Sequence, residues 1–303
     1  MVLKIVEGGT YMFQIISDSG CDFSEKEAKE NGVTIVPFYI SLDGENYLKE
    51  GIDIKKDDYF KMLIENKKLF PKTSQPSPAD YIDVMTPSLE KGEDIIILTV
   101  SSFLSGSNQS AVSAAKLLEE QYPQRQIIVI DSLNGCIGQG IILREIIRMK
   151  KNGLDTLKTK EVAEKIIKNT RIYFTLDSLE YLKKGGRIGP ASAMVGGILN
   201  LRPILYVEEG KVASLEKVRG KKNAFKLMKE ALIEALREEK TNIVFSIGHI
   251  LSLEDALEFK DAIEKALEIT IETDITEVGP AIGTHIGPGA LAFAYCKKYE
   301  NFL

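Results

Sequence analysis

The chain has 303 residues, of which 44% are hydrophobic and 27% are charged, and its formal net charge at pH 7 is −5. A chain of this length and composition is expected to fold as a soluble globular protein with two domains. The acidic balance and the lack of a strongly basic segment exclude nucleic acid as the main partner, because neutralising phosphates requires clustered Lys and Arg.

The first half of the chain alternates between apolar runs and helix-like patterns. Such alternation is typical of parallel sheets covered by helices, so residues 1–156 are predicted to form a three-layer parallel α/β domain. Ligands in sheets of this kind bind at the C-terminal ends of the strands. The predicted strands lie at 13–17, 33–40, 95–100 and 126–130, and the predicted helices at 24–31, 53–66 and 78–91, from about 107–109 onward, and at 137–151.

The first predicted strand ends in a polar turn that contains Asp18 between two serines. One interpretation is that Asp18 binds a metal ion or orients a hydroxyl group. The other, which we favour, is that its carboxylate hydrogen-bonds the backbone of its own turn, as Asp commonly does in such places.

A loop at 70–79 contains three prolines. Prolines hold an extended, non-helical path, and this path presents Thr73, Ser74 and Gln75. A stiff loop with hydroxyl groups suits ligand contacts. The alternative is a connector that ends where Ser77 and Pro78 begin the next helix.

A turn rich in hydroxyl groups follows the strand at 95–100. Ser101, Ser102, Ser105 and Ser107 precede the next predicted helix. The free amides and the positive dipole end of a helix start favour an anionic group, and serine hydroxyls can complete its shell. The turn therefore indicates a carboxylate or phosphate site, unless the serines only cap the helix and fill the turn.

The pattern changes near residue 157, and residues 157–303 are predicted to form a second α/β domain. Antiparallel pairs, including a hairpin at 203–218, indicate a mixed sheet. Residues 191–199 are apolar with small members, which favours close packing over a ligand channel. Further strands are predicted at 171–176, 242–248 and 269–277, and helices at 161–169, 179–184, 221–239 and 253–267.

The sequence contains two histidines, His249 and His285. His249 follows a predicted strand and is expected to be a satisfied histidine. His285 is expected in a glycine-rich loop at 279–290, where ligand contact is favoured. A Ser-His-Asp hydrolase would combine His285 with Ser102 or Ser105, but neither serine lies in a GxSxG elbow.

Motifs for a nucleotide cofactor, for a metal site and for targeting are missing from the sequence. No GxGxxG or GxxxxGK[ST] follows a predicted strand, so no motif supports a nucleotide site. Three widely spaced cysteines without CxxC support neither a disulfide framework nor a zinc site, and a reducing cytoplasm fits best. No run is long enough for a signal peptide or a membrane span.

Considered together, five motifs in order along the chain resemble the DegV family. The resemblance implies a two-domain bacterial fatty-acid-binding protein, similar to the subunit that presents a fatty acid to a separate kinase for acyl-phosphate formation. It implies no catalysis by this chain, and no cofactor or metal. The motifs are SDSGCD (17–22), KTSQPSP (72–78), SSFLSGSNQSA (101–111), LKKGGRIG (182–189) and HIGPGA (285–290).

The resemblance also assigns residues. Thr73 and Ser105 match hydroxyls that hold the carboxylate of a long-chain fatty acid of the palmitate or oleate class, and His285 matches a head-group histidine. The second domain is then expected to enclose the acyl chain. Further pocket candidates are Ser74, Ser102 and Gly106.

Arg187 and Arg219 match basic positions on the face toward the partner or the phosphate. The glycines around Arg187 are expected to leave it exposed. The implied partner is the catalytic subunit of fatty acid kinase, and a transient contact with a membrane surface is compatible with this role. Residues 1–11 lie outside the family pattern. The alternatives that stay open are a serine hydrolase using Ser105 and His285, and a sugar-kinase-like enzyme.

Overall fold

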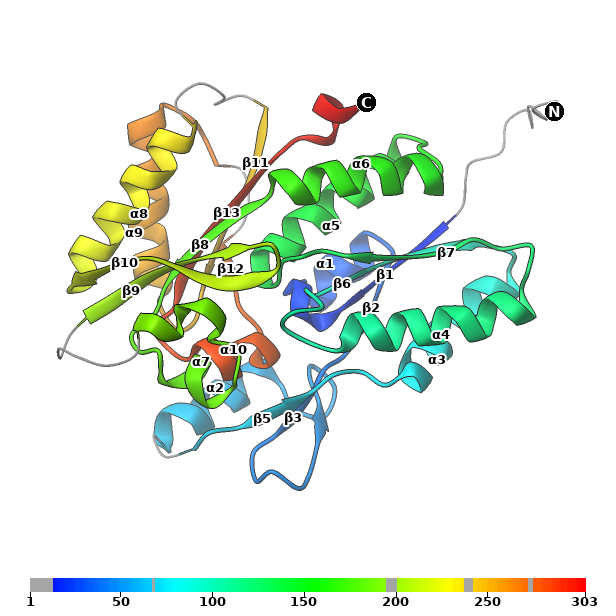
Figure 1. Ribbon diagram of the computed structural model, residues 1–303, viewed down its shortest axis with the longest axis horizontal. Coiled ribbons are helices and arrows are strands. Elements are labelled where there is room, and N and C mark those ends of the chain that lie inside the picture. The colour runs from blue at the N-terminus through cyan, green and yellow to red at the C-terminus, as the bar shows by residue number, and fades with distance from the viewer. Residues whose placement is uncertain (1–12, 67–68, 195–200, 237–241, 272–274) are drawn as a thin grey trace.

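The computed structural model describes residues 13–66, 69–194, 201–236, 242–271 and 275–303. Two β-sheets organise the chain, with helices between them and on their outer faces (Figure 1). The strands of the first sheet come from residues 13–131 and those of the second from residues 171–297. The predicted combination of a parallel and a mixed sheet is confirmed.

The first sheet is parallel, with strand order β2-β1-β6-β7. Its centre consists of apolar residues that are buried on both faces, such as Ile15 and Ile96, which lie side by side in the register. Strands covered on both faces read as continuous apolar runs, which is why the sequence predicted them well. The strands are β1 (Phe13–Asp18), β2 (Val33–Val36), β6 (Asp94–Thr99) and β7 (Ile127–Asp131).

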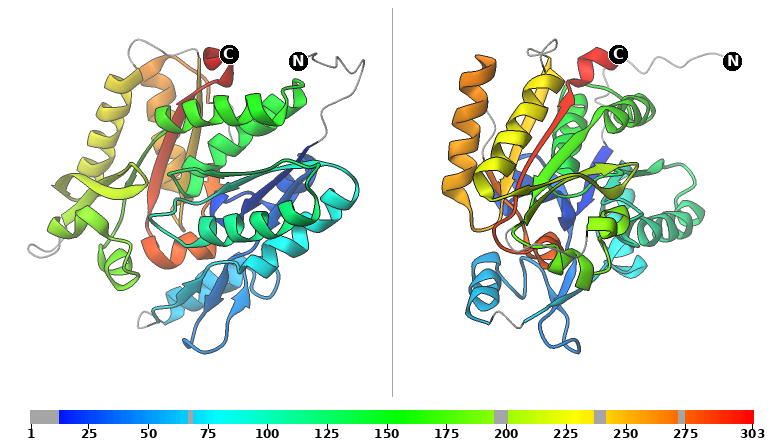
Figure 2. Two further views of the ribbon diagram at one scale, coloured as in Figure 1. Left: turned by 45° about the vertical axis from the view of Figure 1, so that its right-hand side comes forward. Right: turned by 60° about the vertical axis from the view of Figure 1, so that its left-hand side comes forward.

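Helices cover both faces of this sheet and make the predicted three layers (Figure 2). Ser24 caps the first helix by accepting the amide of Glu27, and Ser77 caps the third through a capping box with Asp80. Helices α3 and α4 cover one face. The helices of this half are α1 (Glu25–Glu30), α2 (Lys56–Glu65), α3 (Pro78–Glu90), α4 (Ser107–Gln121) and α5 (Cys136–Lys151).

A small third sheet departs from the prediction. The strand expected at 33–40 is interrupted at Pro37, which has no amide proton for a sheet. Its second part, β3 (Tyr39–Ser41), pairs with β4 (Leu48–Lys49) across the predicted turn at 42–45, and with β5 (Lys72–Ser74). The proline-rich loop therefore contains a short strand.

The second sheet is mixed, with strand order β10-β9-β8-β13-β11-β12. Only β11 and β12 pair in parallel, and the other neighbours are antiparallel. The strands are β8 (Arg171–Thr175), β9 (Leu201–Glu208), β10 (Lys211–Arg219), β11 (Ile243–His249), β12 (Ile275–Glu277) and β13 (Leu291–Lys297).

Two predictions for this sheet were wrong. The strand expected at 269–277 is limited to β12 within the described residues, which omit 272–274. No further strand was predicted after it, although β13 lies inside the sheet between β8 and β11. The sequence of β13, LAFAYCK, alternates small and large residues after a glycine-rich stretch, so it lacks the β-branched run by which the other strands were recognised.

Helices α8 and α9 cover the outer face of the mixed sheet (Figure 2). The described part of the apolar stretch at 191–199 belongs to a 3-10 segment, η2 (Gly189–Met194), and residues 195–199 lie outside the described residues. The remaining helices are α6 (Thr156–Asn169), α7 (Glu180–Lys184), α8 (Lys221–Leu236), α9 (Leu253–Leu267) and α10 (Pro280–Ile286).

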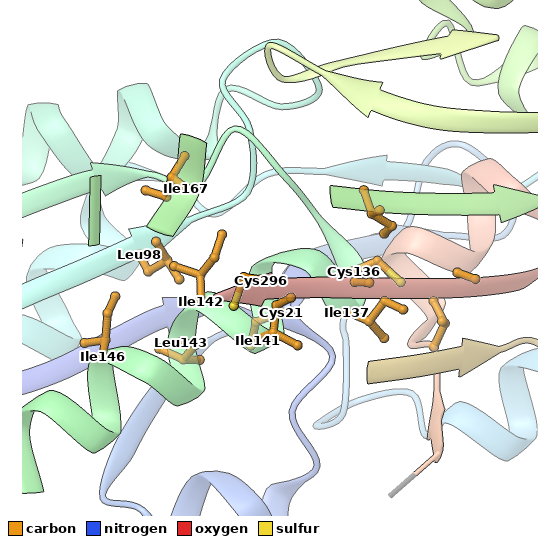
Figure 3. Packing of buried hydrophobic residues seen from close by; sticks show 14 of the residues in the cluster. Cys21, Leu98, Cys136, Ile137, Ile141, Ile142, Leu143, Ile146, Ile167 and Cys296 are labelled. Atoms are coloured by element: carbon orange, nitrogen blue, oxygen red, sulfur yellow. The ribbon is translucent and has the colours of Figure 1, made fainter. Parts of the chain in front are cut away.

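The helix α5 lies between the two sheets and joins their cores. Its side chains Ile141 and Ile142 belong to one cluster with Leu98 of β6 and Cys296 of β13 (Figure 3). The three cysteines of the chain are buried and free. Within the described part of the chain, no helix combines the length and hydrophobicity that crossing a bilayer requires.

Candidate ligand site

An apolar cavity lies where α5, α10 and strands of the mixed sheet meet the ends of β6 and β7. It encloses about 1000 Å³ that protein atoms do not fill, including its open mouth. Its apolar wall includes Phe38, Val100, Leu104, Cys136, Ile172, Phe174, Leu182, Val207, Val212, Val278, Ala281, Ile282, Ile286, Ala290 and Ala292.

Thr73 and His285 meet in this cavity. The Oγ1 atom of Thr73 lies 2.8 Å from Nε2 of His285, within hydrogen-bond distance. Thr73 is placed by β5, where it pairs with Ile40, and the alternation of the strand sends its neighbour Ser74 to the exposed side. Ser74 does not line the cavity.

His285 lies in the last turn of α10, and the expectation of a loop position was wrong. The helix has proline at its first position and Gly287 as its C-cap, with φ of 74°. Proline at the start and glycine at the end of a segment are helix boundary signals as well as loop residues, so here they mark a short helix. Because the helix fixes the backbone of His285, the imidazole has a defined direction toward Thr73.

His285 is neutral at physiological pH. Burial, with a smaller contribution from the nearby Arg187 guanidinium, lowers the pKa of His285 to about 4. Its Nδ1 atom is buried and has no hydrogen-bond partner in the described structure. A Cβ atom at Gly185 would lie 2.2 Å from this Nδ1, so the glycine permits the imidazole to approach the backbone after α7.

Ser105 also lines the cavity, at the turn before α4. Its Oγ atom accepts a hydrogen bond of 3.2 Å from the amide of Ser107, so it contributes to the helix start as the capping interpretation expected. Among the described hydrogen bonds, the hydroxyl proton of Ser105 has no acceptor. It can therefore be donated to an oxygen atom in the cavity.

The other two pocket candidates are placed differently. Ser102 is exposed, its amide points to the carboxylate of Asp131, and it does not line the cavity. Gly106 is the N-cap of α4 and makes room for Gln75, whose Nε2 atom would lie 2.4 Å from a Cβ atom at residue 106. Gln75 itself lines the cavity. Gln75 is therefore a cavity residue beyond the predicted site residues.

The two arginines occupy different environments. Arg187 is half-buried and lines the cavity, with Nε 3.0 Å from the carbonyl of Leu104 and Nη1 2.6 Å from that of Gly185. The exposure expected from its glycine neighbours is therefore only partial. Arg219 ends β10, is exposed and does not line the cavity.

Asp18, the last residue of β1, is a structural residue. It is fully buried, and burial raises its pKa. Its carboxylate accepts hydrogen bonds from Ser107 Oγ (2.7 Å), the amide of Val100 (3.0 Å) and Gln139 Nε2 (2.9 Å). These bonds join β1, β6, α4 and α5 and extend beyond the local turn that we expected. No group of three or more His, Cys, Asp or Glu residues that could hold a metal ion occurs within the described ranges.

His249 ends β11 and lines the cavity on its sheet side. Its Nδ1 atom accepts the amide of Ser252 at 3.3 Å, so it is a satisfied histidine at a strand end. Burial lowers its pKa. The site combines one long apolar wall with a short polar end formed by Thr73, Ser105, His285 and Arg187, an arrangement that suits an amphipathic molecule with a small oxygen-bearing head.

Comparison with known proteins identifies relatives of this chain. A family model described as the DegV family of uncharacterised proteins matches residues 12–298. A DegV domain-containing protein of Caldanaerobacter subterraneus subsp. tengcongensis is 33% identical, over 94% of this chain and 98% of the relative.

Two solved structures share the fold over nearly the whole chain. A stearic-acid-binding protein from Eubacterium ventriosum superposes with a TM-score of 0.91 and 32% identity, covering 96% of this chain and 100% of that one. A fatty-acid-binding DegV family protein from Thermus thermophilus superposes with a TM-score of 0.85 and 29% identity, covering 94% and 99%.

Proposed function

This chain belongs to the DegV family, and from this relationship we propose that it binds a long-chain fatty acid. The observation that carries the proposal is the cavity, whose apolar wall ends at the polar group of Thr73, Ser105 and His285. The structural relatives that bind stearic acid and other fatty acids support the same ligand class.

The acyl chain dominates the binding free energy. Burying about fourteen methylene groups at ~0.8 kcal/mol each gives roughly 11 kcal/mol of gross transfer free energy, an upper bound before ordering costs. We assign the enclosure of the tail to residues 157–303, where α10 and β8 contribute several apolar side chains to the wall, and the head-group contacts to residues 1–156 together with His285. Chain length and unsaturation are set by the shape of this wall.

The head group is a carboxylate that receives hydrogen bonds from Thr73 and Ser105. The neutral His285 can donate Nε2–H to Thr73 Oγ1, which leaves the Thr73 hydroxyl proton free for the ligand. Each such bond to a charged oxygen contributes about 1.5–3 kcal/mol. The guanidinium of Arg187 at the cavity edge adds positive potential where the carboxylate would lie.

We further propose that the chain presents this carboxylate to a separate fatty acid kinase, which forms the acyl phosphate, and that it catalyses no step alone. Arg187 at the cavity and the exposed Arg219 would contact the partner's acidic residues or the forming phosphate. The geometry is less favourable for a serine hydrolase. In the described structure His285 Nε2 bonds Thr73 and has no hydrogen bond to Ser102 or Ser105. The buried free cysteines suit a cytoplasmic setting.

Native mass spectrometry of protein purified from a bacterial host tests the ligand class. Under native conditions the mass should exceed the denatured mass by that of one fatty acid. Protein that is empty, and that also fails to take up added oleate or palmitate, would overturn the proposal. Hydrolysis of activated esters that disappears in Ser105→Ala would favour the hydrolase, and ATP-dependent phosphorylation by this chain alone would favour the kinase-like enzyme.

A further inference from the structure

Two acidic residues from distant parts of the chain hold the first turn of α10. Asp22 Oδ1 accepts a hydrogen bond of 2.8 Å from the amide of Gly279, and Glu50 Oε1 accepts one of 2.9 Å from the amide of Ala281. The N-cap Gly279 has no side chain that could do this. The two carboxylates therefore supply the acceptors that a capping side chain normally provides.

Both carboxylates converge on the same glycine. A Cβ atom at residue 279 would lie 2.7 Å from Glu50 Oε1 and 3.1 Å from Asp22 Oδ1. Asp22 is reached from β1 through a short 3-10 segment, η1 (Ser19–Cys21), while Glu50 directly follows β4. Asp22 and Glu50 thus connect α10 to both the parallel sheet and the small sheet.

The helix held in this way is part of the cavity wall and carries the head-group histidine. Ala281 and Ile282 line the cavity in its first turn, and His285 follows Ala281 by about one turn. The helix has seven residues. Because a helix this short moves as a unit, a displacement of its first turn changes the distance between His285 and Thr73.

We propose that Asp22 and Glu50 are positioning residues for the fatty-acid site, which fix the first turn of α10 and thereby set the contact between His285 and Thr73. This inference rests on the proposed function. Neither acidic residue is among the residues that line the cavity. They act through α10, so their effect on binding is indirect.

Further contacts connect the two acids with the cavity wall. Glu50 Oε2 accepts the hydroxyl of Ser19, and Ser19 Oγ accepts the amide of Phe38 at 2.9 Å. Phe38 lines the cavity. Asp22 and Glu50 therefore support two parts of the wall, α10 and the segment before β3.

The charged and titratable groups that face Asp22 and Glu50 include Asp18, Cys21, Lys56, Tyr59 and Cys136. Lys56 is itself paired with Glu277 at 3.0 Å. Burial raises the pKa of Glu50 to about 7 and that of Asp22 to about 6. A protonated acid keeps its carbonyl oxygen as an acceptor for the helix amide. A glutamine side chain, whose amide oxygen is also an acceptor, should therefore be able to take the place of Glu50.

The test follows the titration of His285 in the ligand-free protein by NMR. The sequence has only two histidines, so the variant His249→Gln assigns the imidazole signals. In the unmodified protein His285 should not titrate between pH 8 and 5.5, since its pKa is about 4. In Glu50→Ala the imidazole of His285 should become more exposed to solvent, and its pKa should therefore rise toward about 6.5.

Affinity for oleate provides the second measurement. In Glu50→Ala it should fall about tenfold, which corresponds to about 1.4 kcal/mol. Glu50→Gln should restore both the affinity and the titration, because Gln keeps the acceptor for Ala281. The matched control is Glu145→Gln. Glu145 is a buried carboxylate that accepts the amide of Tyr299 at 2.7 Å on the far part of α5, and its loss should change neither measurement.

Unchanged His285 titration and oleate affinity in Glu50→Ala would overturn the positioning role. So would equal changes in Glu145→Gln, since these would show a general loss of stability. If Glu50→Ala does not fold, Glu50→Asp, which is one methylene shorter, must show the same shift in weaker form. Unmodified protein that binds no fatty acid, combined with a shifted His285 titration in Glu50→Ala, would refute the proposed function and leave the positioning role intact.

Discussion

Two polar clusters border the turn between β6 and α4: the Asp18 cluster and the head-group site with Thr73, Ser105 and His285. They differ in how many of their hydrogen-bonding groups have partners within the protein. Both oxygens of Asp18 accept hydrogen bonds, and all its donors come from the protein. At the head-group site, Thr73 and His285 bond each other, but the Ser105 hydroxyl proton has no acceptor among the described hydrogen bonds. Buried polar groups normally find partners, so unused capacity beside a cavity indicates a place for a ligand.

Ser105 and Ser107 are only two residues apart, but they belong to different clusters. Ser107 is buried and donates its hydroxyl to Asp18, while it also bonds Tyr81. Ser105 lines the cavity with a free proton. The same residue type at one helix start therefore serves the fold in one case and the proposed ligand in the other.

The largest expected effect is a loss of protein stability when the Asp18 cluster is disrupted. Asp18→Ala should lower the free energy of unfolding by about 3–5 kcal/mol, because three buried donors lose their acceptor. Urea denaturation at pH 7 measures this. Thr73→Val, at the other cluster, should cost about 1 kcal/mol or less. Equal losses at the two positions would remove the distinction between a structural and a ligand-binding cluster.

Removing a donor from the head-group site should affect binding instead. Thr73→Val and Ser105→Ala should each weaken oleate binding by about 1.5–3 kcal/mol, and the double variant by more than either single one. Isothermal titration calorimetry or a fluorescent fatty-acid displacement assay measures the affinities.

The neighbouring serines are the matched controls for these variants. Ser74→Ala and Ser102→Ala should bind oleate as the unmodified protein does, since both residues lie outside the cavity. Methyl oleate, which cannot accept charge-assisted hydrogen bonds, should bind more weakly than oleate to the unmodified protein. Equal affinities for acid and ester would contradict the carboxylate site.

The pH dependence of stability should have opposite signs at the two clusters. The pKa of His285 is lowered to about 4 from an ordinary value of 6.5, so the native state binds fewer protons than the unfolded state in this range. This contribution is present above pH 6.5 and is lost as the pH falls toward 4. The raised pKa of Asp18 acts in the reverse direction, and its contribution is lost as the pH rises.

The variant His285→Gln isolates the histidine part. The difference in unfolding free energy between unmodified protein and variant should decrease as the pH falls from 6.5 to 4, by about 1.4 kcal/mol for each unit of pKa shift at most. Urea denaturation at several pH values measures it. A difference that is independent of pH would mean that His285 is not buried in its neutral form.

The smallest effects are expected at the two arginines. Arg187→Ala should lower oleate affinity by about threefold, because it borders the cavity and holds the carbonyl of Leu104. Arg219→Ala should leave the affinity unchanged. Both variants should reduce acyl-phosphate formation when a fatty acid kinase and ATP are supplied. Loss of fatty-acid binding in Arg219→Ala would place that residue in the pocket, and unchanged turnover in both would place the partner face elsewhere.

Much of the parallel sheet could be predicted from the sequence because local signals agree there. The buried runs of β1 and β6 are rich in β-branched residues, and Ser24 and Ser77 mark helix starts that the structure confirms. In these places a short stretch of sequence contains the whole structural reason. The polar turn and the proline-rich loop also indicated hydroxyls for a ligand, but only the family resemblance separated Thr73 and Ser105, which line the cavity, from Ser74 and Ser102, which do not.

The rest depends on contacts between distant segments. No local pattern shows that Thr73 of β5 meets His285, that Ser74 faces away, or that Asp22 and Glu50 cap a helix more than two hundred residues later. The position of β13 inside its sheet was missed for the same reason. Its small residues Ala292 and Ala294 fit only because its neighbours β8 and β11 supply the packing.

The position of β13 also determines the order in which the molecule can be completed during synthesis. Its partners β8 and β11 are made earlier, yet they have no direct pairing with each other and wait for β13 to join them. Domains generally fold as units, and the N-terminal one folds first during synthesis. The parallel sheet can therefore form first, while the cavity wall at Ala290 and Ala292 closes only after β13 emerges. Until then the apolar surface of the cavity wall stays exposed to solvent. During this interval the nascent chain is therefore most prone to aggregate and to bind chaperones.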